Sequence, residues 1–421
     1  MKAITFLGTT KYRPTTYFYK RREYETRFFA EALPHLFPDL EQVLVFVTPT
    51  VQEHENLTAL QERLGELLHP VPIPEGHSES ELWETFDALT GAVAEGEEVL
   101  FDITHSFRSI PFLVFLAAAY VRATMPVSVR RVVYGAFEAR DEETNRTPVF
   151  DLTPFVSLLD WLTATDRFVE TGDGRPLANL LRKRMPPGPL MGEDLDARAL
   201  GHQLKYAAEA IGEVSLALNV TRPLEAMRAA VQLDHNLRQA REAVSTRARP
   251  FALLADQVRD SYAPFALEDP LAEDNWLANL RLQLAMVRWH LDKEQIVQAA
   301  TLAREWLVSA VAYRVGVESL VNRDEVRQPI ARALNNAVRR SRDRPIDRPT
   351  SFDDDVAALP VVEELVAAWS KLRDLRNDLA HVGMNENPQS AERLCRTMNK
   401  LYPSLDELAA ALLTDYNEAT Q

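Results

Sequence analysis

The chain has 421 residues, of which 46% are hydrophobic, and this supports two or three soluble domains with packed cores. Its 62 acidic and 47 basic side chains give a formal net charge of −15, which argues against a polyanion-binding surface over the whole molecule, so any nucleic-acid site must be local. The single cysteine, Cys395, excludes an intramolecular disulfide framework and indicates a reducing, cytoplasmic location.

The first 150 residues alternate short β-rich runs with helical patterns. The predicted strands are AITFLG at 3–8, QVLVFVT at 42–48, EVLFDIT at 98–104 and RRVVYGAF at 130–137. Continuously apolar strands separated by helices indicate a mainly parallel α/β sheet with both faces covered. The most apolar segment, residues 110–121, is too short to span a bilayer and is predicted to be a buried helix, so we expect no membrane segment.

Small and hydroxyl-bearing residues follow three of these strands, and ligands of parallel sheets gather at the carboxyl ends of strands. After the third strand, a polar loop leads into the predicted helix, whose free backbone N–H groups attract phosphate, and Arg108 adds a bidentate donor. Alternatively, the loop only starts the helix and His105 only satisfies a loop carbonyl. The predicted ligand-binding residues are Gly8, Thr9, Thr10, Thr48, Thr104, His105, Ser106 and Arg108.

Several familiar signatures are absent from the sequence. There is no G-x-G-x-x-G motif after the first strand and no G-x-x-x-x-G-K-[ST] motif, so neither a dinucleotide dehydrogenase nor a P-loop NTPase is expected. The nine histidines form no H-E-x-x-H motif and no cluster with carboxylates at ligand spacing. We therefore expect neither a metal site nor a bound cofactor.

The second half of the chain shows only helical periodicity after the breaker-rich stretch RMPPGPLMGED at 184–194. Residues 322–350 contain eight arginines against four acidic residues, together with three prolines. Such a charge run is usually a solvated loop, and contact with RNA is the alternative.

The stretch LRDLRNDLAHVGMN at 372–385 predicts an amphipathic helix, because its leucines recur at spacings of three and four. On the polar side, Asn377 and His381 are stacked one turn apart. Arg376 lies about 140° round the helix from His381 and must curl its side chain to join them. Taken alone, an R-x-x-x-x-H pattern is more typical of a solvated helix face than of an active site.

These side chains have the chemistry to act on a phosphodiester such as that of RNA, which carries its own nucleophile in the 2′-OH group. His381 can move protons near neutral pH, and Arg376 can stabilise the charge that develops on the phosphate. Asn377 can orient the imidazole or the phosphate. Arg376, Asn377 and His381 are thus candidates for phosphate chemistry that requires no metal ion.

Several segments resemble the CRISPR-associated Rossmann-fold (CARF) sensors of type III CRISPR systems. They are FLGTTKY at 6–12, DITHSFRSIP at 102–111, YGAFEA at 134–139, TPVFDLTPF at 147–155 and WLTATDRFVETGDG at 161–174. The hexapeptide RNDLAH at 376–381 is similar to the R-x-x-x-x-H site of HEPN (higher eukaryote and prokaryote nucleotide-binding) ribonucleases, the usual partner of CARF sensors. Such sensor loops often carry glycine where this chain has Ser106.

The resemblance implies an α/β Rossmann-like parallel sheet, the CARF domain at 1–175, then a linker at 176–200 and an all-α helical HEPN domain at 201–421. It further implies that cyclic oligoadenylate, with cyclic tetra-adenylate as the expected ring, binds across the axis of a homodimer or higher oligomer. Binding would switch on metal-independent cleavage of single-stranded RNA that leaves 2′,3′-cyclic phosphate ends, with Arg376, Asn377 and His381 as the predicted catalytic residues. The alternatives are a ligand-binding regulator with an inert HEPN-like dimerisation domain, and a CARF-site ring nuclease that degrades the cyclic activator.

Overall fold

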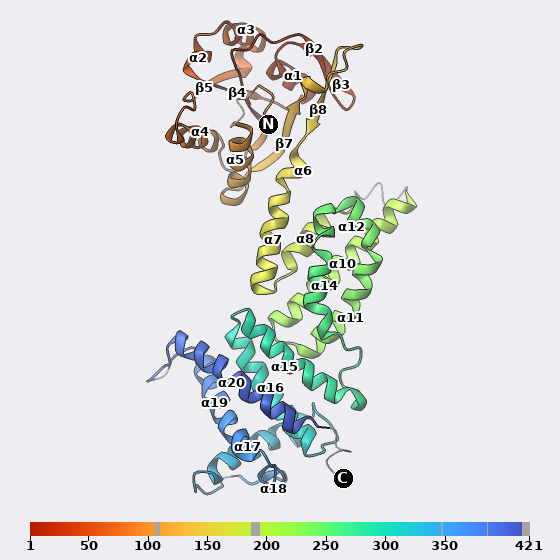
Figure 1. Cartoon of the computed structure of the whole chain (residues 1–421), viewed down its shortest axis with the longest axis vertical. Helices are drawn as coiled ribbons and strands as arrows, with labels where there is room; N and C mark the ends of the chain where they lie inside the picture. The colour runs from red at the N-terminus through yellow and green to blue at the C-terminus, as the bar shows by residue number, and fades with distance from the viewer. Residues whose placement is uncertain (106–109, 187–193, 347, 385, 415–421) are drawn as a thin grey trace. The chain divides into compact units, whose positions relative to one another are not determined.

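The structure is a computed structural model that describes residues 1–105, 110–186, 194–346, 348–384 and 386–414. The chain divides into two compact units, unit 1 at Met1–Asp160 and unit 2 at Trp161–Gln421. Unit 1 is built around an eight-stranded sheet with helices, and the described part of unit 2 is helical (Figure 1).

The sheet of unit 1 has the strand order β3-β2-β8-β7-β6-β1-β4-β5. Its strands are β1 (Lys2–Phe6), β2 (Thr15–Tyr19), β3 (Arg22–Thr26), β4 (Gln42–Val47), β5 (Leu68–Pro72), β6 (Glu98–Asp102), β7 (Ser128–Gly135) and β8 (Arg146–Asp151). The helices around it are α1 (Phe29–Leu36), α2 (Pro49–Gln52), α3 (Glu55–Leu64), η1 (Gly65–Leu67), α4 (Glu79–Gly91), α5 (Ile110–Thr124), η2 (Phe137–Ala139) and α6 (Thr153–Val156). Among the strands that the structure describes, the β7–β8 and β2–β3 pairs are antiparallel and the other pairs are parallel, so the predicted mainly parallel α/β sheet is confirmed.

The four predicted strands are confirmed as β1, β4, β6 and β7, with ends that differ by up to two residues. The β2–β3 hairpin, β5 and β8 were not predicted. The hairpin turns at Lys20, which has a φ of 57°, and β3 is an edge strand with a largely exposed, charged sequence. β5 forms the opposite edge and contains Pro70 and Pro72, which lower its strand propensity but are tolerated at an edge.

Both faces of the sheet are covered, as the apolar strand sequences predict. Along β1, Ala3 packs into the core on the side of α1 and α3, whereas Ile4 and Phe6 pack into the core on the side of α4 and α5. This distribution reflects the two-residue period of a strand. The sheet therefore lies between two packed layers of helices, and the loops at its edge start from a rigid core.

The helix predicted at 110–121 forms as α5, but the prediction that it is buried is wrong for one of its faces. Val114, Ala117 and Val121 are fully buried, whereas Phe112 and Tyr120 are 66% and 52% exposed. The sequence is apolar all round, so its periodicity cannot tell the face that packs on the sheet from the face that is left uncovered.

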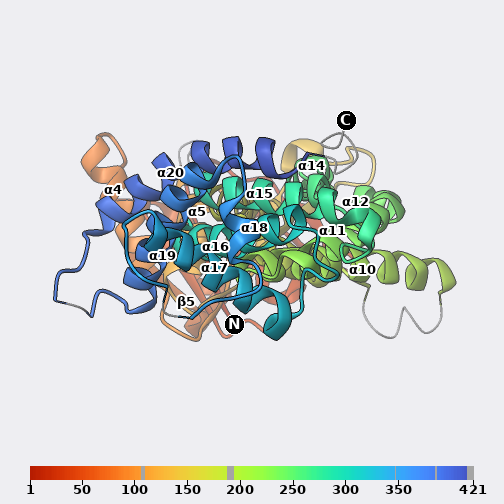
Figure 2. The same cartoon turned by 90° about the horizontal axis from the view of Figure 1, so that it is seen from below.

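Unit 2 contains α7 (Leu158–Thr171), whose first residues belong to unit 1, followed by a series of helices. They are α8 (Arg175–Lys183), α10 (Leu195–Asn219), α11 (Pro223–Gln239), α12 (Arg241–Arg247), α13 (Arg249–Ala252), α14 (Ala255–Tyr262), η3 (Ala263–Phe265), η4 (Glu273–Asn275), α15 (Trp276–Asp292), α16 (Ile296–Arg314), η5 (Arg323–Arg327), α17 (Gln328–Arg340), α18 (Asp353–Ala357), α19 (Val362–Ala380) and α20 (Ala391–Leu412). The central α16 packs against α15, α19 and α20 (Figure 2).

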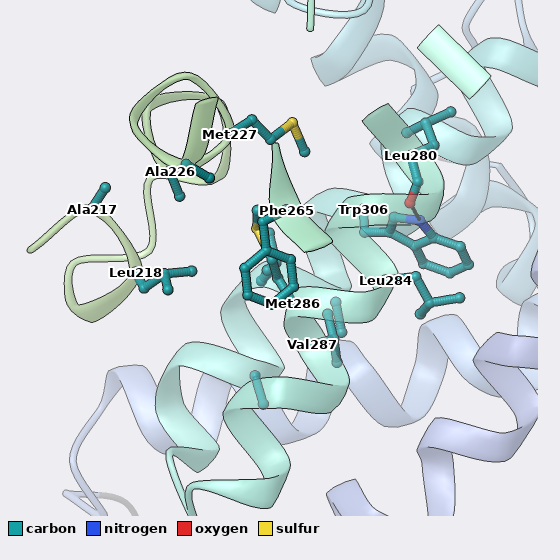
Figure 3. Close-up of a cluster of buried hydrophobic side chains, with 14 of the residues drawn as sticks. Ala217, Leu218, Ala226, Met227, Phe265, Leu280, Leu284, Met286, Val287 and Trp306 are labelled. Atoms are coloured by element: carbon teal, nitrogen blue, oxygen red, sulfur yellow. Dashed lines mark hydrogen bonds between the residues drawn. The ribbon is translucent and has the colours of Figure 1, made fainter. Parts of the chain in front are cut away.

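One continuous apolar core runs through unit 2. Figure 3 shows the part where side chains of α10, α11, η3, α15 and α16 meet, including Met227, Phe265 and Met286. Trp306 is fully buried there, and its indole N–H donates to the carbonyl of Leu280 at 2.9 Å. The indole is therefore buried with its polar atom satisfied, as a stable core requires.

The turn between α7 and α8 is fixed by Asp173. Arg175 donates to both carboxylate oxygens of Asp173 at 2.6 and 2.8 Å, and these bonds lower the pKa of Asp173 to about 2. Gly172 has a φ of +69°, and an added Cβ would lie 2.2 Å from the ring of Trp289. The turn thus needs glycine both for its backbone conformation and for the close approach of the indole.

The division of unit 1 from unit 2 lies before the domain boundary expected at 175, and the linker expected at 176–200 is largely helical where the structure describes it. In α8, Leu177, Ala178 and Leu181 are fully buried and pack with α10. The Pro- and Gly-rich composition nearby obscured this short amphipathic helix. Among the described residues, no helix is long and apolar enough to cross a membrane.

Candidate functional sites

The carboxyl ends of β1, β4 and β6 lie side by side in unit 1, because β4 and β6 pair in parallel with β1 on opposite sides. The strand order continues outwards to β5 on one side and to β7 on the other, so this is a topological switch point, where α/β sheets bind ligands. The residues that the structure brings to this edge are Gly8, Thr9, Thr10, Thr48, Thr104 and His105. The predicted Ser106 and Arg108 lie outside the described residues.

The loop after β1 is held in place by Asn56 of α3. This buried amide donates to the carbonyls of Gly8 and Thr10 at 2.9 and 3.1 Å, and the backbone N–H of Gly8 donates to the Tyr12 hydroxyl at 2.9 Å. Thr9 and Thr10 are exposed. The loop therefore presents two hydroxyl-bearing residues from a backbone that is already anchored.

Asp102, at the end of β6, organises this edge and was not among the predicted site residues. It is fully buried, and its carboxylate accepts from Thr5 Oγ1 at 2.5 Å and from the backbone N–H and Oγ1 of Thr104 at 2.8 and 2.5 Å. Burial raises the pKa of Asp102 to about 6 despite these bonds. The signal in the sequence was an aspartate that ends an otherwise apolar strand.

Thr104 connects the loop after β6 to the neighbouring strand. Besides donating to Asp102, its hydroxyl oxygen accepts from the backbone N–H of Gly135 in β7 at 2.8 Å. Its side chain is thus engaged within the sheet edge, where it positions the start of the loop.

His105 is engaged with α1. Its Nε2 accepts from the backbone N–H of Phe29 at 3.2 Å, in the first turn of that helix, and its ring packs on Tyr12 with the centroids 4.1 Å apart. Burial lowers the pKa of His105 to about 4, so the imidazole is neutral near pH 7. A neutral ring that accepts at Nε2 carries its proton on Nδ1. The ring therefore ties the β6 loop to α1.

The loop after β4 is already contacted by a carboxylate from the segment that follows β5. Glu75 accepts from the backbone N–H and Oγ1 of Thr50 at 2.8 and 2.5 Å, and these bonds hold the pKa of Glu75 below its usual value. Thr48, the predicted ligand-binding residue of this loop, is buried at the N-cap of α2. Any phosphate that reached the Thr50 amide would have to displace Glu75.

In unit 2, Arg376, Asn377 and His381 lie at the carboxy-terminal end of α19, and all three are exposed. The predicted apolar face is confirmed, since Leu372 and Leu375 are buried. The backbone N–H of His381 donates to the carbonyl of Asn377 at 3.0 Å, which places these residues one helical turn apart. Arg376 Nη1 donates to Asn377 Oδ1 at 3.4 Å, so the structure brings the arginine to the asparagine.

Asp378, which sequence analysis passed over, anchors the end of this helix. Its side chain is buried, and its Oδ2 accepts from the backbone N–H of Gln389 at 2.9 Å. The intervening turn contains Val382 at a φ of 54° and Gly383 at 71°, and it leaves the side chains of Val382 and Met384 exposed. Asp378 thus fixes where His381 stands relative to the following segment.

Among the residues that the structure describes, no group of three or more histidine, cysteine, aspartate or glutamate side chains could hold a metal ion. The predicted residues instead offer a guanidinium, an amide and an imidazole on one exposed helix end. Such a set can bind a phosphodiester and transfer protons.

The chain contains an α/β unit with a topological switch point and a helical unit that carries an exposed Arg-Asn-His set. Residues 157–264 match the family model described as the second domain of the CRISPR-associated protein MJ1674. The CRISPR-associated protein MJ1674 of Methanocaldococcus jannaschii is 32% identical over 109 residues, which are 25% of this chain and 17% of that protein. The chain is therefore similar to a CRISPR-associated protein through this segment, and it spans much less than two thirds of that relative's length.

A solved structure of Enterococcus italicus Csm6 bound to cyclic hexa-2′-fluoro-hexa-dAMP is also similar. It aligns with 99% of this chain and 96% of its own, at a TM-score of 0.49 and 11% sequence identity.

Proposed function

We propose that the chain is a metal-independent endoribonuclease that cleaves single-stranded RNA when cyclic oligoadenylate binds to unit 1, in type III CRISPR defence. The observation that carries the proposal is the exposed set of Arg376, Asn377 and His381 on α19, in a chain that also contains a segment similar to a CRISPR-associated protein. The resemblance of the two halves to CARF sensors and HEPN ribonucleases supports it.

The chemistry follows from the three side chains. RNA supplies the 2′-OH nucleophile, and the imidazole of His381 takes or gives the proton. The guanidinium of Arg376 stabilises the charge that develops on the phosphate oxygens, and its contact with Asn377 brings it to the residue that lies one turn before His381. In-line attack by the 2′-OH expels the 5′-oxygen, which takes up a proton, and leaves a 2′,3′-cyclic phosphate.

The edge of the sheet supports the sensor role. The hydroxyl-bearing residues after β1 are exposed on an anchored backbone, and α5 follows directly after the predicted ligand loop. The buried contacts of Asp102, Thr104 and His105 fix the position of the first residues of that loop. A ligand with several phosphates and adenine bases would be recognised by such a preorganised edge.

A homodimer is the proposed working form, and α5 of unit 1 offers a surface for it. Phe112, Leu116 and Tyr120 recur every four residues on α5 and are exposed. An exposed apolar row of this kind marks an interaction surface, and a two-fold axis would pair it with itself. A dimer would also supply two copies of Arg376 and His381, so that acid and base can come from different subunits.

The proposal is tested by comparing RNA cleavage in His381→Ala and His235→Ala, each with cyclic tetra-adenylate. His235 is an exposed histidine on α11 of the same unit and serves as the matched control. We expect His381→Ala to lose about 10²- to 10⁴-fold in rate, because the proton-transfer group is removed. His235→Ala is expected to retain full activity, and both variants should unfold as the wild type does. Wild-type activity in His381→Ala would disprove the site.

A further inference from the structure

Unit 2 contains a cavity of about 450 Å³ beside α19 whose lining is dominated by arginine. We infer that this arginine pocket binds backbone phosphates of the RNA strand and holds it next to the candidate catalytic residues, an inference that rests on the proposed function. The arginines that line it are Arg332, Arg339, Arg342, Arg344, Arg348 and Arg373.

Two of these arginines are placed by the amphipathic character of α17. Ile330, Leu334 and Val338 of this helix are buried in the core of unit 2. Arg332 and Arg339 are seven residues apart, which places them on nearly the same face, about 20° apart. The helix therefore presents both guanidinium groups to one side.

The loop after α17 brings three more arginines to the same place. Asn336 is buried, and its side-chain amide donates to the carbonyl of Arg348 at 3.0 Å and to the carboxylate of Asp353 at 2.9 Å. Asp353 also accepts from the backbone N–H and the hydroxyl of Thr350 at 3.0 Å each. The loop is thus pinned back along α17, so that Arg342, Arg344 and Arg348 line the pocket.

The sixth arginine comes from α19, which the fully buried Trp369 fastens to α17. Its indole N–H donates to Asn335 Oδ1 at 3.0 Å, and Asn335 also lines the pocket. Arg373 lies one turn further along α19. The arginine pocket is therefore a product of the tertiary fold, although five of its six arginines come from one charge run in the sequence.

The pocket concentrates positive charge with little compensation. Arg373 pairs with Asp374 at 2.9 Å, whereas the other five arginines pair with no carboxylate among the described residues. Among the described residues, no carboxylate lines it, and the side chains of Arg342, Arg344 and Arg348 make no hydrogen bond or ion pair. Arg332 and Arg339 donate to neutral oxygens of Gln328 and Pro345. Like charges gathered in a concave surface repel one another and attract a polyanion. In a chain with a net charge of −15, this gathering indicates a local anion site.

The position of Arg373 indicates which anion is bound. Arg373, Asn377 and His381 are spaced by four residues along α19, so they form one row with about 40° between successive members. Eight residues of helix separate Arg373 from His381 by about 12 Å along the axis. A strand whose phosphates sit in the pocket can therefore continue along α19 to the candidate active site.

The lining also indicates how the strand is recognised. Guanidinium groups match phosphate oxygens through paired N–H donors, whereas no aromatic side chain lines the pocket within the described residues. Recognition of bases in single strands usually relies on stacking on aromatic rings. The arginine pocket is thus suited to the sugar-phosphate backbone and is expected to hold RNA irrespective of its sequence.

The test measures RNA binding by the full chain carrying His381→Ala, which prevents cleavage, with and without Arg342→Gln and Arg344→Gln. Both arginines are exposed, so their replacement leaves the core intact. Fluorescence anisotropy with labelled oligo(U) and oligo(A) over a series of KCl concentrations gives affinity and salt dependence. We expect about 3- to 10-fold weaker binding to both RNAs. The slope of log K against log salt should fall by about 1.4, since each lost phosphate contact contributes about 0.7.

The matched control replaces Arg238 and Arg241, which are exposed on α11 and α12, by glutamine in the same His381→Ala background. Its affinity and salt slope are expected to remain those of the parent. Unchanged binding and slope in the pocket variant would overturn the inference, and so would loss of cyclic tetra-adenylate binding without loss of RNA binding. If the parent bound no RNA at all, the inference would fall as well.

Cleavage by the chain with His381 intact, measured in parallel, separates this inference from the proposed function. Pocket-dependent RNA binding without any cleavage would support the inference and contradict the proposed catalysis. Cleavage together with pocket-independent binding would contradict the inference alone.

Discussion

Replacing Asp102 by asparagine should change how the stability of unit 1 depends on pH. Burial raises the pKa of Asp102 to about 6, from the 3.8 of an exposed aspartate. The folded state therefore binds the proton more tightly than the unfolded state, and stability is lost as the pH rises from about 4 to about 6. A pKa that differs by about two units between the folded and unfolded states changes the free energy of unfolding by about 3 kcal/mol. About 2 kcal/mol of this stability is lost between pH 4 and pH 7.

The asparagine variant should not show this loss, because its amide does not titrate. Its Oδ1 can still accept both bonds from Thr104, and its NH₂ group can donate to the Thr5 hydroxyl in place of accepting from it. The melting temperature of the variant minus that of the wild type should therefore increase between pH 4 and pH 7. For a unit of about 160 residues, about 2 kcal/mol corresponds to about 4–8 °C.

Differential scanning calorimetry of the full chain measures this difference in melting temperature. The unfolding transition that the substitution shifts is assigned to unit 1. Burial lowers the pKa of His105 to about 4, so the contribution of His105 to folding stability has the opposite pH dependence. It is lost as the pH falls, because the buried imidazole then has to take up a proton. It is present in both proteins and cancels from the comparison. A difference in melting temperature that is constant with pH, or that shrinks as the pH rises, would refute the reasoning.

Two further predictions concern the turn of unit 2 and the apolar row of unit 1. Gly172→Ala should destabilise unit 2 by about 2–4 kcal/mol in urea unfolding, because the new Cβ overlaps Trp289 and the φ is positive. Gly316→Ala, at a φ of +74° with open space around it, should cost only about 1 kcal/mol, and equal effects would contradict the packing argument. If the chain forms the proposed dimer, replacing Phe112 and Tyr120 together by lysine should convert it to monomer in sedimentation velocity, and a dimer that persists would show that α5 is not its interface.

The sequence predicted the parts of unit 1 whose patterns are local. The apolar runs of β1, β4, β6 and β7 identify buried parallel strands, and the residues that follow them identify the switch-point edge. The hairpin of β2 and β3 escaped notice because charged residues dominate its edge strand. Asp102 was passed over because its role depends on Thr5, which is 97 residues away in sequence.

In unit 2, the leucine spacing predicted the buried face of α19, and with it the exposed position of Arg376, Asn377 and His381. The arginine run between 322 and 350 can be read in the sequence, but the sequence does not show that its side chains line one pocket. Only the bonds of Asn336 and Trp369 show that the loop folds back on α17 and that Arg373 completes the pocket. Such long-range contacts leave no periodic signal in a single sequence.

The most direct test of the proposed function is the cleavage of a fluorescent single-stranded RNA by the full chain in EDTA, with and without cyclic tetra-adenylate, followed by analysis of the product ends. We predict that the ring accelerates cleavage, that EDTA leaves the rate unchanged, and that the products end in 2′,3′-cyclic phosphates. A strict requirement for Mg²⁺, or the absence of cleavage with tri-, tetra- and hexa-adenylate rings alike, would contradict the proposed function.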